Sequence, residues 1–217
     1  MAAETHADVS DAQDRQAGRS DKARTESFSD GVLSVFITLM VLDLRPPESG
    51  PGGLLSTLLR QWPAYLAYLS SYLYIAVIWL NHKAAFKRIR VIDHGLHWAN
   101  VGVLFAAALL PFATATVAEA LRRDDPADAR TAIALYALVG ALLCACWLRF
   151  YHYLSRHPEL VAKGVEAHFF ARERRRAWGG IGIYLVAGAL GHEVAPLIAM
   201  AIFLAVPIFL DLTHEGM

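Results

Sequence analysis

Residues 28–44 read FSDGVLSVFITLMVLDL, and this stretch decides the fold class of the chain. Apart from Asp30 and Asp43 it holds only apolar, glycine and hydroxyl-bearing residues, and the sequence Arg45-Pro46-Pro47 ends it. A bilayer core of roughly 30 Å is crossed by about 20 helical residues. We therefore predict a first transmembrane helix here, because lipid is the solvent in which so apolar a run is stable as a helix.

Further apolar runs recur along the chain. Three of them are residues 62–80, 97–120 and 130–154. A last block, residues 177–210, is too long for one crossing, so we expect two short helices joined by a tight turn at residues 191–195. Pro111 is expected to kink the helix over residues 97–120. The chain is thus predicted to be an all-α polytopic membrane protein with six transmembrane helices.

Charged residues lie in blocks between these runs. Of the 217 residues 56% are hydrophobic and 18% are charged, and the formal net charge is zero. A soluble domain of this length would spread its charges along the chain. The composition therefore excludes an ordinary soluble protein, and no nucleic-acid partner is expected.

The positions of Lys and Arg predict the orientation in the membrane. If the N-terminus is cytoplasmic, fourteen of the 20 lysines and arginines lie in cytoplasmic segments and five lie outside. Cytoplasmic loops of membrane proteins carry an excess of these residues. We therefore predict a multi-pass protein of the cell membrane with both termini in the cytoplasm.

The segments outside the apolar runs are polar. Residues 1–23 hold no apolar run, so they are predicted to be a disordered cytoplasmic tail and not a signal peptide. Residues 24–211 form the transmembrane domain, and residues 212–217 form a cytoplasmic C-terminal tail. The stretch 164–176, GVEAHFFARERRR, is predicted to be an amphipathic cytoplasmic helix near the headgroups. Its arginines fit either the positive-inside rule or a specific site for anionic lipid, and we favour the first.

The first predicted helix differs from the others because it carries polar groups at membrane depth. Asp30, Ser34 and Thr38 lie within it, and such groups usually face protein or water. At about 100° per residue, one side of the helix forms a stripe that is small or apolar apart from one hydroxyl. Its residues are Phe28, Gly31, Val35, Thr38, Leu39 and Leu42. Asp30 points away from this stripe. Ordinary packing between helices would also explain the stripe.

Patterns for metal binding are weak. His94 and His97 could share a metal ion, but no further ligand is patterned with them, so we expect headgroup-level histidines beside Trp98. Cys144 and Cys146 are expected to be small apolar residues of one helix without a mutual disulfide. No metal site and no cofactor are predicted.

Two motifs resemble the signature of a known family. The first is Arg24-x-x-x-Phe28-Ser29-Asp30, which opens a helix that ends in Thr-Leu-x-Val-Leu, and the second is Trp79-x-Asn81-His82. Both are similar to motifs of the transmembrane protein 175 family of potassium channels. The resemblance covers residues 24–211, and the bacterial members carry one six-helix unit per chain, in agreement with the predicted crossings.

The resemblance implies a homotetramer in the lipid bilayer, with four copies of the first helix around a pore. The pore would conduct monovalent cations with a modest preference for potassium. The chain has no TVGYG segment for a carbonyl filter. Rings of Val35, Leu39 and Leu42 would instead form hydrophobic constrictions, and a ring of Thr38 hydroxyls would partly replace the water shell of the ion. Val35 stands where the family often has Ile or Leu, so the narrowest point is expected to be wider or to lie at Leu39.

Phe28, Ser29 and Asp30 are expected to fix the first helix against the second, and Arg24 shares this structural role. The expected partners on the second helix are Trp79, Asn81 and His82. Their indole, amide and imidazole N–H groups are all able to donate to a carboxylate.

Two other kinds of function are alternatives. A secondary transporter of a small cation or metabolite would usually show broken helices in two related halves, of which Pro111 is only a weak hint. A membrane enzyme would need a nucleophile, a base or metal ligands that converge in the bilayer, and the sequence shows no such set. We therefore expect a channel and not an enzyme.

Overall fold

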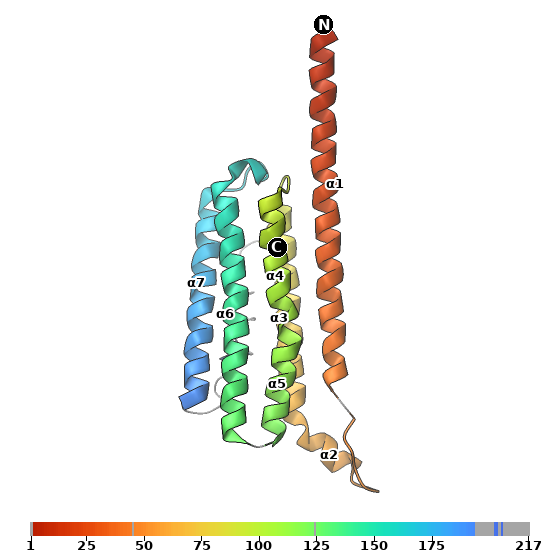
Figure 1. Ribbon diagram of the computed structural model, residues 1–217, viewed down its shortest axis with the longest axis vertical. Helices are drawn as coiled ribbons and strands as arrows, with labels where there is room; N and C mark the ends of the chain where they lie inside the picture. The colour runs from red at the N-terminus through yellow and green to blue at the C-terminus, as the bar shows by residue number, and fades with distance from the viewer. Residues whose placement is uncertain (1, 45, 124, 194–201, 204, 206–217) are drawn as a thin grey trace.

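The computed structural model describes residues 2–44, 46–123, 125–193, 202, 203 and 205, and its regular structure is helical (Figure 1). The α-helices are α1 (Ala2–Leu39), α2 (Leu54–Arg60), α3 (Trp62–Lys87), α4 (His94–Ala108), α5 (Leu110–Arg123), α6 (Pro126–Arg156) and α7 (Ala167–Glu193). Two 3₁₀ segments are η1 (Met40–Asp43) and η2 (Pro158–Leu160). The all-α fold class that the sequence predicted is confirmed.

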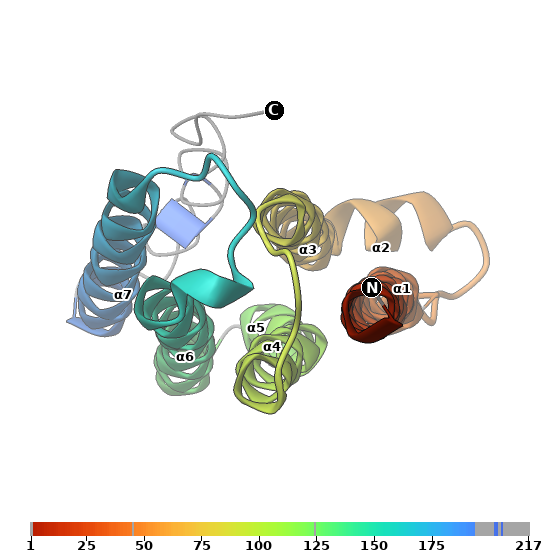
Figure 2. The same ribbon diagram turned by 90° about the horizontal axis from the view of Figure 1, so that it is seen from above.

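Helix α6 lies at the centre of the bundle and packs against α4, α5 and α7, while α3 packs against α5. Helix α1 packs on α3 and α4 at one side of the bundle. Seen from above, α7 lies at the opposite side (Figure 2).

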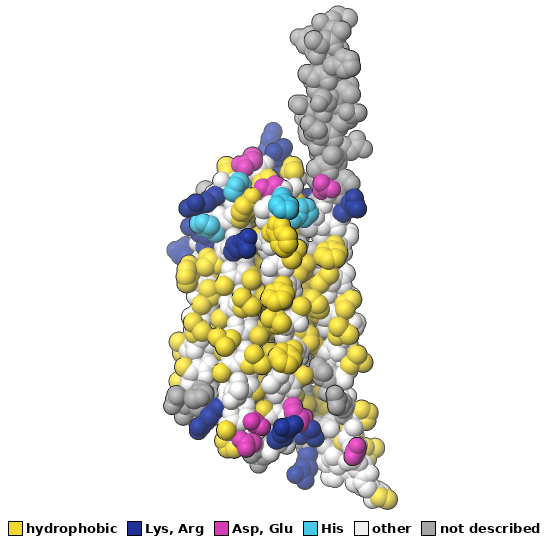
Figure 3. Space-filling view, in the orientation of Figure 1, with side chains coloured by type: hydrophobic (Ala, Val, Ile, Leu, Met, Phe, Trp, Pro, Cys, Tyr) yellow, Lys and Arg dark blue, Asp and Glu magenta, His cyan; other side chains and the backbone are white. Residues whose placement is uncertain are grey.

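Four helical segments are long and apolar enough to cross a membrane. They are Asp21–Leu42, Ala64–Lys87, His94–Arg123 and Pro126–Arg156. On the face that Figure 3 shows, a hydrophobic band lies between two ends that carry charged side chains. The chain is thus a multi-pass membrane protein. The predicted fifth crossing falls in α7, whose described apolar part, residues 177–193, is shorter than a full crossing, and most of the predicted sixth lies outside the described residues.

The kink predicted at Pro111 is a short break in the helix. Helix α4 ends at Ala108 and α5 begins at Leu110, so that together they form one long span. Proline has no N–H, and its ring clashes with the carbonyl of the residue four positions earlier. The break therefore falls one turn or less before Pro111.

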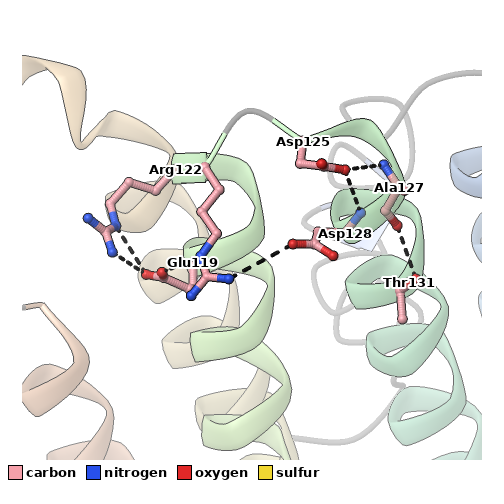
Figure 4. Close-up of polar contacts among 7 residues, drawn as sticks. Glu119, Arg122, Asp125, Ala127, Asp128 and Thr131 are labelled. Atoms are coloured by element: carbon pink, nitrogen blue, oxygen red, sulfur yellow. Dashed lines mark hydrogen bonds and ion pairs between the residues drawn. The ribbon is translucent and has the colours of Figure 1, made fainter.

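The turn between α5 and α6 shows how local chemistry ends one crossing and starts the next (Figure 4). An oxygen of the Asp125 carboxylate accepts from the backbone N–H groups of Ala127 at 2.8 Å and Asp128 at 3.1 Å. This caps the first turn of α6. On α5 the Glu119 carboxylate pairs with Arg122 and Arg123. These charges mark one end of the bundle.

The opposite end of the bundle, where α3 and α6 end and α4 and α7 begin, is called the basic end below. The loop after α3 and the loop after α6 are joined there by a β-bridge between Ile89 and Val161. The N–H of Arg90 donates to the carbonyl of Leu160 at 2.7 Å, and the Lys22 ammonium donates to the carbonyl of Ile89 at 2.8 Å. The two loops and the start of the membrane part of α1 are thus tied together.

Three segments differ from the sequence predictions. Helix α1 extends back to Ala2, where a disordered tail was expected, since this segment lacks proline and is rich in alanine, a strong helix former. The amphipathic helix expected at 164–176 is not separate, because residues 167–176 are the first turns of the continuous α7. Gly191 and the two residues after it remain helical, so the predicted turn at 191–195 does not begin there. Residues 194 and 195 lie outside the described residues.

Helices α6 and α7 approach each other closely through small residues. A Cβ atom added at Gly140 would lie 2.6 Å from the ring of Tyr184, and one added at Gly180 would lie 2.7 Å from the Sγ of Cys144. Glycine has no side chain, so it lets the backbones of two helices approach closely where they meet. These two contacts also fix the antiparallel register of the pair.

Candidate pore helix and its polar anchor

The stripe predicted on the first helix lies on the face of α1 that the rest of the chain leaves uncovered. Val35, Leu39 and Leu42 are 51%, 47% and 69% exposed. Thr38 is also exposed, and nothing lies within 4 Å of a Cβ atom added at Gly31. The opposite face of α1 is buried against the bundle at Ser29 and Leu33, and Met40 at the start of η1 is buried as well. Within one chain, therefore, ordinary packing does not account for this stripe.

Thr38 is the polar group within the apolar part of this stripe. Its hydroxyl donates to the carbonyl of Val35 at 2.9 Å, which is a local contact within the helix. The hydroxyl oxygen keeps a lone pair that faces away from the backbone. One turn further, η1 tightens the chain from Met40 to Asp43. The uncovered face thus presents aliphatic side chains with one hydroxyl between them.

The structure brings Asp30 and Trp79 together. The indole Nε1–H of Trp79 donates to a carboxylate oxygen of Asp30 at 2.9 Å and so joins α1 to α3. The ammonium of Lys83 lies 4.5 Å above the centre of the Trp79 ring, which is the geometry of a cation–π contact. A charge-assisted hydrogen bond between two helices is worth more where water is scarce.

A second polar connection runs from α3 through α4 to α1. The Nδ2–H of Asn100 donates to the hydroxyl of Ser29 at 2.9 Å, and the Nε2 of His82 lies 2.9 Å from the Oδ1 of Asn100. Because that oxygen only accepts, Nε2 of His82 carries the proton. The hydroxyl of Ser29 in turn donates to the carbonyl of Thr25 at 2.8 Å. The side chains of His82, Asn100 and Ser29, which these hydrogen bonds connect, are all buried.

Asn100 was not among the residues singled out from the sequence. The signal was present, since Asn100 is the one amide side chain in the apolar run 97–120, and such groups in a membrane helix usually have a partner. His82 therefore reaches α1 through Asn100 and not directly. Asn81 is half-buried, and its side chain makes no hydrogen bond with any described residue.

Two other residues of the first motif lie at the open edge of this anchor. Phe28 is 62% exposed, and Arg24 is exposed as well. Both line a shallow groove of about 360 Å³ between α1 and α4, together with Asp21, Thr25, His97, Asn100 and Val101. The structure thus separates the motif into Ser29 and Asp30, which bind the bundle, and Arg24 and Phe28, which do not.

The histidine and cysteine pairs have separate surroundings. The indole N–H of Trp98 donates to Nε2 of His94 at 3.0 Å, whereas Nδ1 of His97 lies 3.4 Å from the hydroxyl of Thr25. Among the described residues no group of three potential metal ligands comes together. Cys144 and Cys146 are both free thiols.

Comparison with known proteins places the chain in a family. Residues 24–111 match the family described as endosomal/lysosomal potassium channel TMEM175. A potassium channel of Streptomyces collinus is 37% identical over 179 residues, which is 82% of this chain and 85% of that protein. The human endosomal/lysosomal proton channel TMEM175 is 27% identical over 137 residues, which is 58% of this chain and 27% of the human protein.

A solved structure is similar as well. The crystal structure of a lysosomal potassium-selective channel TMEM175 homolog from Chamaesiphon minutus superimposes with a TM-score of 0.79 at 30% sequence identity. The match covers 91% of this chain and all of the other. These relatives are channels and not enzymes. The sequence motifs, the helical fold and the extent of these similarities together show that the chain belongs to the TMEM175 family.

Proposed function

We propose that this chain is one subunit of a homotetrameric, potassium-permeable cation channel of the cell membrane, with a pore lined by α1. The observation that carries the proposal is the uncovered stripe on α1. An apolar helix face can meet lipid, but this one also carries the exposed hydroxyl-bearing side chain of Thr38, which suits a water-filled path better than hydrocarbon. One helix cannot enclose such a path, so several copies related by symmetry must close it.

Each side chain of the stripe would have its own role in ion conduction. Val35, Leu39 and Leu42 project from successive turns and would form three apolar rings, which resist wetting and so gate the flow of ions. Thr38 lies between the first two rings and would offer hydroxyl oxygens to an ion that has lost part of its water shell. Potassium loses its water more easily than sodium does, and this difference would give the modest preference.

The remaining chain then serves as a scaffold. The bonds from Trp79 to Asp30 and from Asn100 to Ser29 hold α1 at a fixed height and rotation against α3 and α4. This fixes which residues face the axis. We also propose that residues 24–211 form six crossings, with residues 1–23 and 212–217 in the cytoplasm. No cofactor is required, because ion passage involves no covalent chemistry.

The test is planar-bilayer recording of the purified protein under a potassium/sodium gradient. In Leu39→Ala the ring at this level loses three carbon atoms per subunit, so we expect the potassium/sodium permeability ratio to fall several-fold because hydrated sodium then passes. The matched control is Leu138→Ala, which makes the same change at a residue that is 60% exposed on α6, far from α1. This control should keep the wild-type ratio.

Three outcomes would contradict the proposal. A current that is unaltered by Leu39→Ala would show that α1 does not line the pore. A detergent-corrected mass of one subunit would show that the protein is not a tetramer. Saturable flux without single-channel steps would favour the secondary transporter. A reversal potential set by a pH gradient instead of the potassium gradient would make protons the permeant ion.

A further inference from the structure

Helices α6 and α7 pack side by side, and the outer surface along the line where they meet, called the α6–α7 groove below, changes character along its length. On α7 its border is a stripe that begins at the basic end with Arg174 and continues with Trp178, Ile181 and Leu185. These positions follow one another at intervals of four, three and four residues, which places them on one face of the helix. Trp178 is 63% exposed and Leu185 is 48% exposed. One cationic side chain thus stands above an uncovered apolar strip.

The border on α6 has the same order of groups. Ser155 and His152 are exposed at the basic end, and Leu148 and Ala145 follow towards the middle of the membrane. The guanidinium of Arg174 donates to the hydroxyl of Ser155 at 3.1 Å. This bond shows that Arg174 leans across the groove towards α6. It uses one N–H of a group that has five.

In the part of the chain that the structure describes, the two carboxylates nearest to Arg174 in the sequence pair with other side chains. Glu173 is buried and pairs with Arg176, and Glu166 pairs with His168. No carboxylate among the described residues forms an ion pair with Arg174. Dark blue Lys and Arg side chains lie beside cyan His and some magenta Asp and Glu side chains at this end of the bundle in Figure 3. A diffusible anion or an anionic headgroup would therefore meet a positive charge that no carboxylate of the described residues pairs with.

Helices α6 and α7 lie on the side of the bundle away from α1, as Figure 2 shows. If α1 faces the pore axis, α6 and α7 face lipid. Trp is enriched at the level where hydrocarbon gives way to headgroups. Trp178 therefore marks this level on α7, and Arg174 lies one turn nearer to the water.

We propose that the groove between α6 and α7 at the basic end binds one anionic glycerophospholipid. The phosphate accepts from the guanidinium of Arg174 and lies beside Ser155 and His152. One acyl chain lies along Trp178, Ile181 and Leu185, with Ala145 as a low floor on α6. A guanidinium offers two parallel N–H donors to two phosphate oxygens, so it binds a phosphodiester more specifically than a point charge does. This site goes beyond the proposed channel function, and its exposure to lipid rests on the proposed placement of α1 at the pore axis.

The test compares two adjacent arginines. Gly180 and Tyr184 mark the face of α7 that meets α6, and at 100° per residue Arg174 lies about 100° from this face and Arg175 about 160°. Arg175→Gln therefore removes the same charge from the same turn but points away from the groove. Purified full-length protein is titrated with phosphatidylglycerol or phosphatidylcholine, and bound lipid is counted by native mass spectrometry.

We expect Arg174→Gln to weaken phosphatidylglycerol binding at the tightest site about fivefold, which is roughly the contribution of one arginine near an anionic surface. Arg175→Gln should change it by less than about twofold, and phosphatidylcholine binding should stay weak in every variant. Arg174→Lys should recover part of the affinity. Ser155→Ala, which removes only the protein contact of Arg174, should keep it.

Four results would overturn the site. An equal loss in both glutamine variants would mean diffuse attraction to a basic surface, and a loss in Ser155→Ala equal to that in Arg174→Gln would mean a structural contact only. Equal binding of phosphatidylglycerol and phosphatidylcholine would show that the site does not recognise an anionic headgroup. Displacement of lipid by soluble glycerol phosphate at equal concentration would mean a phosphate site without an acyl-chain groove. None of these readouts depends on ion conduction, so the site can fail while the channel stands.

Discussion

The contacts that attach α1 to the bundle differ in kind from the contacts that join α6 to α7. Helix α1 is held by hydrogen bonds, from Trp79 to Asp30 and from Asn100 to Ser29. The pair α6–α7 is held by close packing of glycine against larger side chains. In a membrane the hydrophobic effect does not drive helices together, and these two kinds of contact take its place. A few polar bonds suit a helix that must leave one face free, whereas packing suits helices that stay together.

The largest effect is expected at the polar anchor of α1. In Asn100→Ala the buried Nε2–H of His82 loses its acceptor, and Ser29 loses its donor, so we expect a loss of about 3 kcal/mol in the free energy of unfolding. Asn81→Ala removes the same group at a half-buried position without a hydrogen bond to the described residues, and should cost less than about 0.5 kcal/mol. Chemical unfolding of both variants in detergent measures the difference. Equal losses would show that α1 is not held by hydrogen bonds.

The next effect sharpens the contrast in packing. In Gly140→Ala the new methyl group would lie 2.6 Å from the ring of the fully buried Tyr184, so we expect a loss of about 2 kcal/mol. Gly31→Ala adds the same methyl group on α1, where nothing lies within 4 Å, and should be neutral or stabilising by up to about 1 kcal/mol. Thermal unfolding in detergent distinguishes the two. A destabilised Gly31→Ala that still assembles would show that this face of α1 is packed after all.

The smallest effect concerns the start of α4, the helix that carries Asn100. Burial raises the pKa of the Asp93 carboxyl, but hydrogen bonds from Tyr153 and from the N–H of Leu96 outweigh it and hold the pKa below its ordinary value. A lowered pKa stabilises the fold above about pH 4, and this contribution is lost as the pH falls through the lowered pKa.

Asp93→Asn keeps a helix-capping side chain and loses this charge. We expect it to lower the unfolding free energy by less than about 1 kcal/mol at pH 7 and to match wild type in strong acid. Unfolding of both proteins along a pH series checks this. A difference that persists unchanged at pH 2 would assign the effect to shape and not to charge.

Much of the fold followed from patterns along the chain. The four described spans correspond to apolar runs, and the break before Pro111 follows from a missing N–H. The pairing of Asp30 with Trp79 was also within reach, because a carboxylate at membrane depth needs a donor and the motif supplied one. The short helix α2 and the continuity of α7 were missed, since both depend on where local segments end and not on hydropathy.

The sequence by itself determined that this is a multi-pass helical protein of the TMEM175 family, because hydropathy, proline and a short motif act locally and can be read in order. Only the tertiary structure decided that Asn100 links His82 to Ser29, which are 18 and 71 residues away from it. It also decided which face of α1 stays uncovered and that Arg174 reaches α6. The reason is that a hydrogen bond or a free face depends on which helices become neighbours and on their register, and no local pattern specifies these.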